Sequence, residues 1–288
     1  MIFVSTSYFK ERRSVKLVLN ECSKAAIKNI ELGAAHQYED GIVDFLKKYK
    51  KEHGAEFTIH SYFPPEKKPV IVNLASQNPE ILSKSMSSVK KSIDTAKEIK
   101  ARLYSFHAGF RVDPEGLGKP LERKNIASYE DAYNTFVNSV DEICSYAKSR
   151  DVKVAMEPNV MSNYNLISGK NELLLMCELH EIKMFLDDLK HKNLGILLDL
   201  GHLKVTANNL KFDREEFING VKDRVLGLHV HDTDGFTDAH RPLKANSWVL
   251  EVLNRNLFKK SIPITLEIAD VNIKTLQAQI RLLSSLNQ

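Results

Sequence analysis

Short runs of apolar and β-branched residues alternate along the chain with longer segments in which apolar residues recur at helical spacing. Strands separated by helices predict βα units and a parallel sheet. In 79–100 and 130–148, for example, the apolar residues fall near one helical face. Eight strands are predicted, at residues 2–5, 29–33, 56–60, 102–107, 152–157, 194–199, 225–231 and 262–267.

Eight strand–helix repeats favour a closed (β/α)8 barrel, or TIM barrel, over a doubly wound open sheet. A nucleotide-binding open sheet should show a glycine-rich turn after its first strand, but residues 5–10 read Ser-Thr-Ser-Tyr-Phe-Lys. The 288 residues suit one α/β barrel, so we expect a single domain over 1–288. The longest non-periodic stretches, 63–78, 109–128, 158–171 and 232–245, follow strands, where a barrel builds its active-site face.

Composition narrows the class of protein further. The 41 basic and 37 acidic residues give a formal charge of +4, which does not favour a nucleic-acid partner and does not exclude one. Three widely separated cysteines, Cys22, Cys144 and Cys177, are expected to be reduced and buried. With no basic leader and no apolar run of about 18 residues, we expect a soluble cytoplasmic protein without a membrane span. Nothing indicates the oligomeric state.

Residues able to bind a cation end most of the predicted strands from the third onward. A strand buried on both faces should end in apolar or turn residues, so polar residues repeated at the same end indicate a shared metal centre. Two further pairs, Asp199-Leu-Gly-His202 and Asp238-Ala-His240, follow strands six and seven. The other four histidines, at 36, 53, 180 and 191, are expected to be solvated. The strand-end candidates are His60, His107, Glu157, Asp199, His229, His231 and Glu267.

The candidates differ in how strongly each residue indicates a metal ligand. A single strand-end histidine is more often a core residue than a ligand, but Glu157 and Glu267 follow apolar residues and must be paired, hydrogen-bonded or metal-bound. His229 and His231 alternate around one residue and so point the same way. We expect one to bind metal and the other to lie behind it, with His229 favoured as the ligand. Four loop aromatics are equally compatible with a pocket and with packing: Tyr62, Phe63, Phe110 and Trp248.

These motifs resemble the xylose-isomerase-like TIM-barrel superfamily, over most of the chain. That superfamily includes sugar isomerases and epimerases, and also apurinic endonucleases that use three zinc ions. The resemblance is carried by Ile59-His60-Ser61-Tyr62, Asn73-Leu-Ala-Ser76, Phe106-His107-Ala-Gly109, Met156-Glu157-Pro-Asn159, Leu198-Asp199-Leu-Gly-His202, His229-Val-His-Asp232, Asp238-Ala-His240 and Leu266-Glu267.

In the isomerase and epimerase branch, the resemblance implies one divalent ion (Mn, Mg, Co or Zn) held by Glu157, Asp199, His229 and Glu267. Glu157 and Glu267 would transfer protons next to the substrate carbonyl, while the metal polarises that carbonyl. His202 would act with them on a substrate oxygen. The expected contacts to a small sugar come from His107, His231, Tyr62 and Arg241.

In the endonuclease branch, up to three zinc ions would use nine ligands: His60, His107, Glu157, Asp199, His202, His229, Asp238, His240 and Glu267. All nine residues are present. However, that family's DNA-entering loop carries arginine and tryptophan, which the segment 33–40 lacks, and the segment 63–69 reads as an insertion. The glycines expected after His240 in both branches are also missing. We therefore expect a metal-dependent isomerase or epimerase of a small sugar or sugar derivative, with an apurinic endonuclease as the alternative. A non-catalytic binding barrel is a third possibility.

Overall fold

Eight parallel strands close into a barrel in which each strand pairs with the next along the chain and β8 pairs with β1. This confirms the predicted (β/α)8 fold, and every predicted strand end lies within two residues of the observed one. The strands are β1 (Ile2–Ser5), β2 (Asn29–Leu32), β3 (Glu56–His60), β4 (Tyr104–His107), β5 (Val154–Glu157), β6 (Leu194–Asp199), β7 (Val225–Val230) and β8 (Ile264–Leu266).

The computed structural model describes all residues except 9–12, 35, 69, 117–118 and 287–288. The segments 33–40, 63–69 and 109–128 singled out in the sequence are therefore described except for one or two residues each. Within the described residues, no helix is long and apolar enough to cross a membrane. The three cysteines are buried free thiols, as predicted.

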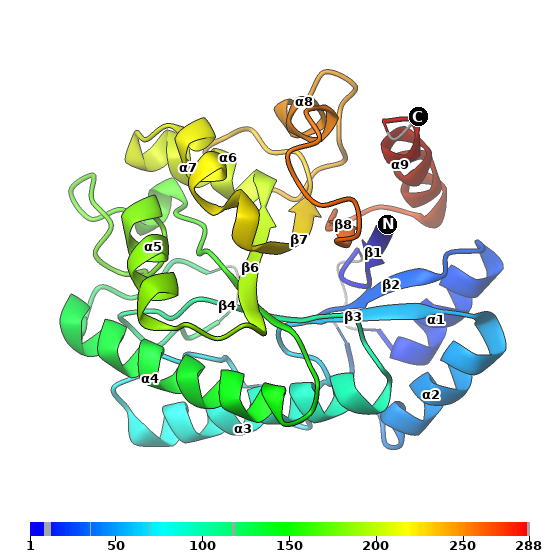
Figure 1. Ribbon diagram of the computed structural model, residues 1–288, viewed down its shortest axis with the longest axis horizontal. Coiled ribbons are helices and arrows are strands. Elements are labelled where there is room, and N and C mark those ends of the chain that lie inside the picture. The colour runs from blue at the N-terminus through cyan, green and yellow to red at the C-terminus, as the bar shows by residue number, and fades with distance from the viewer. Residues whose placement is uncertain (9–12, 35, 69, 117–118, 287–288) are drawn as a thin grey trace.

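Helices surround the strands, and α3 and α4 lie side by side along one edge (Figure 1). The predicted helix at 79–100 is α3, where the side chain of Asn78 accepts a hydrogen bond from Glu80 N at 2.9 Å and Pro79 occupies the first turn. The helices are α1 (Val15–Lys24), α2 (Ile42–His53), α3 (Pro79–Glu98), α4 (Tyr129–Lys148), α5 (Leu179–Asp188), α6 (Leu200–Leu210), α7 (Arg214–Val221), α8 (Trp248–Asn254) and α9 (Ile273–Ser285), with 3₁₀ turns η1 (Asn163–Asn165) and η2 (Lys222–Arg224).

Small residues fill the barrel beneath the strand-end candidates. Side chains two apart on a strand share a face, and the residues two positions before these candidates include Thr58, Ser105, Ala155 and Gly227. A Cβ on Gly227 would lie 3.0 Å from Leu197 Cδ1, so glycine lets the facing side chain fill the interior. The barrel is therefore a packed core that supports the polar residues above it.

Candidate metal centre and pocket

The polar strand-end residues meet at one mouth of the barrel because the sheet is parallel and closed. His107 pairs with Glu157 across β4 and β5, and Asp199 pairs with His229 across β6 and β7. His202 enters from the first turn of α6, while Asp238 and His240 come from the loop after β7. All nine residues expected as ligands are thus brought together.

The ligand atoms form three groups, within each of which all atoms lie within 4.8 Å of one another. We call them the His60 group, the carboxylate-rich group and the histidine-rich group. Glu157 belongs to the first two, so a single carboxylate connects them. In order, the groups are His60, His107 and Glu157; Glu157, Asp199, His229 and Glu267; and His202, His231, Asp238 and His240.

The donor atoms at this centre are buried without hydrogen-bond partners. Eleven buried side-chain nitrogen and oxygen atoms among the described residues have no such partner, and eight of them belong to these groups. Buried polar atoms are normally hydrogen-bonded, and leaving them unpaired is costly. Carboxylate oxygens and imidazole nitrogens are the usual protein donors for divalent transition metals. The residues present therefore fit divalent metal.

The turn at Asp199 orients the two oxygens of its carboxylate differently. Asp199 ends β6 and begins α6, and its Oδ1 accepts a hydrogen bond from His202 N at 2.8 Å. Its Oδ2 has no hydrogen-bond partner and lies 3.9 Å from His229 Nδ1. One oxygen of this carboxylate thus caps a helix, which leaves the other for a cation.

The electrostatics of the cluster favour charged carboxylates beside charged His202, His229 and His240, whereas burial lowers the pKa of His107 to about 4. Burial opposes ionisation of Glu157, but the neighbouring His107 and His60 lower its pKa to about 2. For Glu267, burial is outweighed by His229, which holds the pKa of the carboxyl below its usual range. Burial works against the charge on His240 as well, but Asp238 raises its pKa to about 9. The protein without metal therefore holds protons where metal would bind.

A carboxylate inside the barrel, Glu31 on β2, contacts this centre and was missed by the sequence analysis. Its Oε2 accepts a hydrogen bond from His229 Nε2 at 3.0 Å, and from the hydroxyls of Thr265 at 3.2 Å and Thr58 at 3.3 Å. This contact leaves His229 Nδ1 facing the metal ligands, 2.8 Å from Glu267 Oε2. A charged residue inside a buried parallel strand was the available signal.

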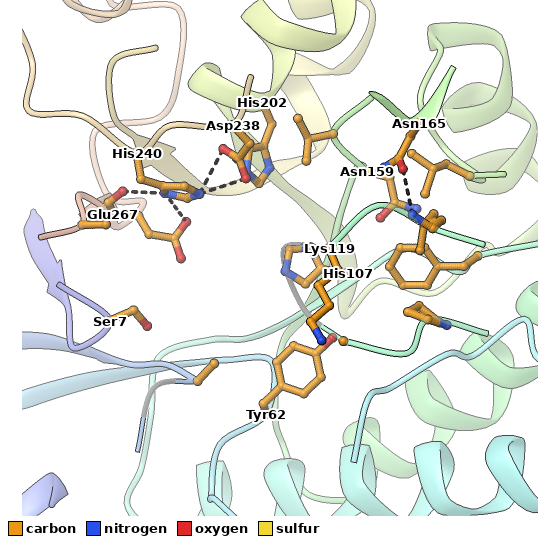
Figure 2. Close-up of a pocket in the computed structure, with 18 of the residues that line it drawn as sticks. Ser7, Tyr62, His107, Lys119, Asn159, Asn165, His202, Asp238, His240 and Glu267 are labelled. Atoms are coloured by element: carbon orange, nitrogen blue, oxygen red, sulfur yellow. Dashed lines mark hydrogen bonds and ion pairs between the residues drawn. The ribbon is translucent and has the colours of Figure 1, made fainter. Parts of the chain in front are cut away.

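A cavity of about 340 Å³ opens above the centre. His202, Asp238, His240 and Glu267 lie together on one side of it, and Asn159 and Asn165 lie on the opposite side (Figure 2). This volume falls within the range of small-molecule sites, about 300–1,000 Å³. Among the described residues that line the cavity, Lys119 is the one lysine or arginine.

The far wall of the cavity is largely apolar and comes from the loops after β4 and β5. These loops pair with each other, because Arg111 N donates to Leu173 O at 2.8 Å and Asn165 Oδ1 accepts from Leu121 N at 3.0 Å. They also share a small core separate from that of the barrel. Apolar and aromatic wall residues include Phe110, Leu121, Tyr164 and Leu174.

Two residues expected to contact substrate do not line this cavity. His231 is fully buried, because its ring packs behind the mouth among the metal-ligand candidates. Arg241 points away: its backbone pairs with Asp232, and its half-exposed side chain lies 3.5 Å from Asp234. The other two expected contacts, His107 and Tyr62, do line the cavity.

The remaining candidates from the sequence divide between pocket and packing. Phe110 lines the cavity, whereas Phe63 is fully buried away from it. Trp248 begins α8, and its indole N–H donates to Glu215 Oε1 at 3.2 Å. The expectation of a solvated His36 is wrong, because its ring is buried and lies 2.8 Å from Thr6 Oγ1.

The family model described as the xylose isomerase-like TIM barrel matches residues 19–284. The chain belongs to this family. Two proteins with similar sequences are uncharacterised proteins of Methanocaldococcus jannaschii. MJ1614 is 24% identical over 90% of this chain and 86% of its own length. MJ1311 is 24% identical over 74% of this chain, and the match spans 64% of MJ1311, less than two thirds of its length.

Solved structures of similar shape share the barrel fold. A D-tagatose 3-epimerase-like protein has a TM-score of 0.75 and 18% identity, with 99% of this chain and 98% of that chain covered. D-psicose 3-epimerase from Clostridium cellulolyticum H10, crystallised with D-tagatose, has a TM-score of 0.65 and 14% identity, with 99% and 96% covered. At these identities the likeness establishes the fold.

Proposed function

We propose that this chain is a divalent-metal-dependent isomerase or epimerase of a small sugar or sugar derivative. The observation that carries the proposal is the position of Glu267. Its carboxylate belongs to the carboxylate-rich group and also lines the cavity, with 14% of its side chain exposed. A base at that position touches both the metal centre and the space in which a substrate would lie.

The carboxylate-rich group would hold the ion. A bound divalent ion supplies Lewis-acid polarisation of a carbonyl and its neighbouring hydroxyl. Glu267 is ionised, with its pKa held below the usual range, so it can accept the proton on the carbon next to that carbonyl. His229 Nδ1 lies 2.8 Å from Glu267 Oε2, so both donors face the same place for an ion.

Glu157 has a different environment from Glu267. Its side chain is fully buried, with Oε2 3.3 Å from His60 Nε2 and Oε1 3.1 Å from His202 Nδ1. We therefore assign Glu157 chiefly to metal binding. As a second proton-transfer group it would have to act in the gap between His107 and His202, which line the cavity in front of it. His107, His202 and Tyr62 are the proposed contacts to substrate oxygens.

The cavity and the structural neighbours support a sugar substrate. Its size suits a small molecule, and it joins a polar floor to an apolar wall. The D-psicose 3-epimerase that shares the fold was crystallised with D-tagatose. Such a likeness supports the choice of substrate class, which the experiment below tests.

A zinc-dependent apurinic endonuclease is the second candidate, because all nine ligands assemble into three groups and Glu157 belongs to two of them. Neighbouring metal ions are suited to phosphodiester displacement. The surroundings favour it less. Duplex binding relies on several lysine and arginine contacts to phosphates, whereas Lys119 is the one such residue among the described cavity residues and Arg241 points away.

The deciding experiment follows the α-protons of a panel of ketoses in deuterated water, with enzyme loaded with Mn²⁺, Co²⁺ or Zn²⁺. We expect metal-dependent deuterium incorporation into at least one ketose or its product. In parallel, an abasic duplex is incubated with the zinc-loaded enzyme. Strand cleavage without exchange into any ketose would replace the isomerase proposal with the endonuclease.

A further inference from the structure

A second cavity, of about 450 Å³, adjoins the cavity above the metal centre, which we now call the first cavity. Ala34, Tyr62 and Gly116 line both cavities, so the two spaces meet there. We propose that the substrate has two units: a reacting sugar in the first cavity and an uncharged ring bearing hydroxyls in the second. We rely here on the proposed function and name the class of sugar on which it would act.

One wall of the second cavity comes from the segment 63–69, singled out in the sequence as an insertion. Pro64, Pro65 and Glu66 of that segment line the cavity, and Val70 and Ile71 continue the wall. None of these five residues lines the first cavity or belongs to a metal-ligand group. The insertion therefore builds a space that the metal chemistry does not require, next to the space in which a sugar would react.

Buried contacts hold this wall in place. The ring of Phe63 is fully buried and meets that of His36 edge to face, with centroids 6.2 Å apart. His36 Nδ1 lies 3.3 Å from the carbonyl oxygen of Arg13, so the neutral ring carries its proton there and Nε2 accepts from the hydroxyl of Thr6 at 2.8 Å. Burial lowers the pKa of His36 to about 4, which keeps the ring neutral. The second cavity is thus preformed, as ligand sites usually are.

Tyr62 is the large side chain at the boundary between the cavities, whereas Ala34 and Gly116 are small. Tyr62 lies in the turn after β3 with a φ of 71°, a left-handed conformation that bulky residues rarely adopt. Such strain persists only where the surroundings impose it, and it is common at ligand sites. Tyr62 lies apart from Asp238 and His240 (Figure 2). A substrate that extends past Tyr62 would therefore lead away from those residues and into the second cavity.

The lining of the second cavity suits an uncharged ring with hydroxyls. Two prolines, Val70 and Ile71 offer apolar contact to C–H groups. The carboxylates of Glu66 and Glu115 can accept hydrogen bonds from hydroxyls. Among the described residues that line this cavity, none is a lysine or arginine. Phosphates and carboxylates are typically bound by those two side chains, so an anionic second unit would meet two carboxylates and no opposite charge.

The test measures the binding of ketoses to the metal-loaded full chain by isothermal titration calorimetry. D-Fructose is the one-ring probe, lactulose and isomaltulose are two-ring ketoses of different linkage, and D-fructose 6-phosphate is the anionic probe. We expect at least one two-ring ketose to bind about tenfold or more tightly than fructose, because its second ring adds contacts in the second cavity. The phosphate should bind no more tightly than fructose.

Ile71→Trp fills the second cavity and leaves the first intact, because Ile71 lines only the second. It should remove the preference for the two-ring ketose and leave fructose binding unchanged. Val70→Phe repeats the test at the neighbouring position if Ile71→Trp does not fold. Ile280→Trp is the matched control, because that residue is also half-buried, lies on α9 and lines neither cavity; it should keep the preference.

Two-ring ketoses that bind no more tightly than fructose would overturn the proposal, as would a preference that survives filling of the second cavity or tighter binding of the phosphate. The α-proton exchange described above, measured in parallel, separates this proposal from the proposed function. A two-ring preference that is lost in Ile71→Trp, without exchange into any ketose, would keep the second cavity as a binding site and reject the isomerase. Exchange into fructose without that preference would reject the second site alone.

Discussion

The carboxylate-rich and histidine-rich groups lie side by side but differ in both donors and exposure. The first has three carboxylates and one histidine, and the second has three histidines and one carboxylate. Carboxylates suit Mg²⁺ and Mn²⁺, whereas imidazole suits zinc and later transition metals. In the first group Glu157, Asp199 and His229 have fully buried side chains and Glu267 alone reaches the cavity. By contrast, His202, Asp238 and His240 of the second group all line the cavity, so one mouth offers a buried carboxylate-rich centre reached through Glu267 and a histidine-rich centre at the cavity surface.

The largest expected effect comes from substituting Glu267, the residue through which the carboxylate-rich group reaches the cavity. Glu267→Gln keeps the shape and one oxygen donor but removes the base, so proton exchange into a responsive ketose should fall about 100- to 10,000-fold, or about 3–5 kcal/mol. The measurement is deuterium incorporation, together with circular dichroism to verify the fold. Glu251→Gln, on the exposed side of α8, is the matched control and should exchange at the wild-type rate.

If Glu267→Gln exchanges as fast as wild type while metal stays bound, Glu267 is not the essential base. The proton-transfer role would then return to Glu157, and the exposure of Glu267 to the cavity would have no catalytic significance.

Removing metal tests whether both groups need cations. An ion that binds only the native state and is present at 100 times its Kd stabilises that state by about 2.7 kcal/mol. Chelation should therefore abolish exchange and lower Tm by roughly 5 °C or more. Differential scanning calorimetry before and after verified metal removal measures the shift. An unchanged Tm would mean that the cluster is stable without cations.

Glu31→Gln tests whether Glu31 orients His229 for metal binding in the carboxylate-rich group. The glutamine amide can donate to His229 Nε2, which moves the ring proton to Nδ1 and blocks the nitrogen that faces the metal ligands. Losing such an outer partner typically weakens metal binding 10- to 100-fold. Metal titration should detect this loss as weaker binding at the carboxylate-rich group.

Thr265→Val is the graded control for Glu31, because it removes one of the three hydrogen bonds to Glu31 Oε2 and leaves the carboxylate in place. It should weaken metal binding less than Glu31→Gln does. Equal effects from the two variants would indicate general loosening of the barrel interior and not a specific action on His229.

The sequence predicted the strand-end ligands because a closed parallel sheet brings the same end of every strand to one mouth. It could not separate His229 from His231: both point the same way by strand period, and their different groups depend on the curvature of the barrel and on the space that Gly201 leaves for the His231 ring. The substrate contact predicted for Arg241 was wrong because the backbone pairing of Arg241 with Asp232 fixes the loop, and this turns the side chain away from the cavity. Glu31 was overlooked because its partners lie on β3, β7 and β8, far away in sequence.

The pH dependence of metal binding is expected to be about tenfold per pH unit for each proton displaced. Asp238 raises the pKa of His240 to about 9 despite the opposing effect of burial, and the pKa values of His202 and His229 lie well above their usual value for the same kind of reason. Metal must displace these protons, so its apparent affinity should rise with pH up to about 9.

In the protein without metal, the same raised histidine pKa values make the stability of the fold decrease as pH rises. A histidine with a raised folded-state pKa contributes stability that is fully present below its unfolded pKa, near 6.5, and is lost as pH rises through about 9. The carboxylate of Glu157, with a pKa of about 2, does not titrate in this window. The increase in Tm on adding metal should therefore grow from pH 6.5 toward pH 9. Paired melting curves with and without metal measure it, and a constant increase would show that the cluster binds metal without releasing protons.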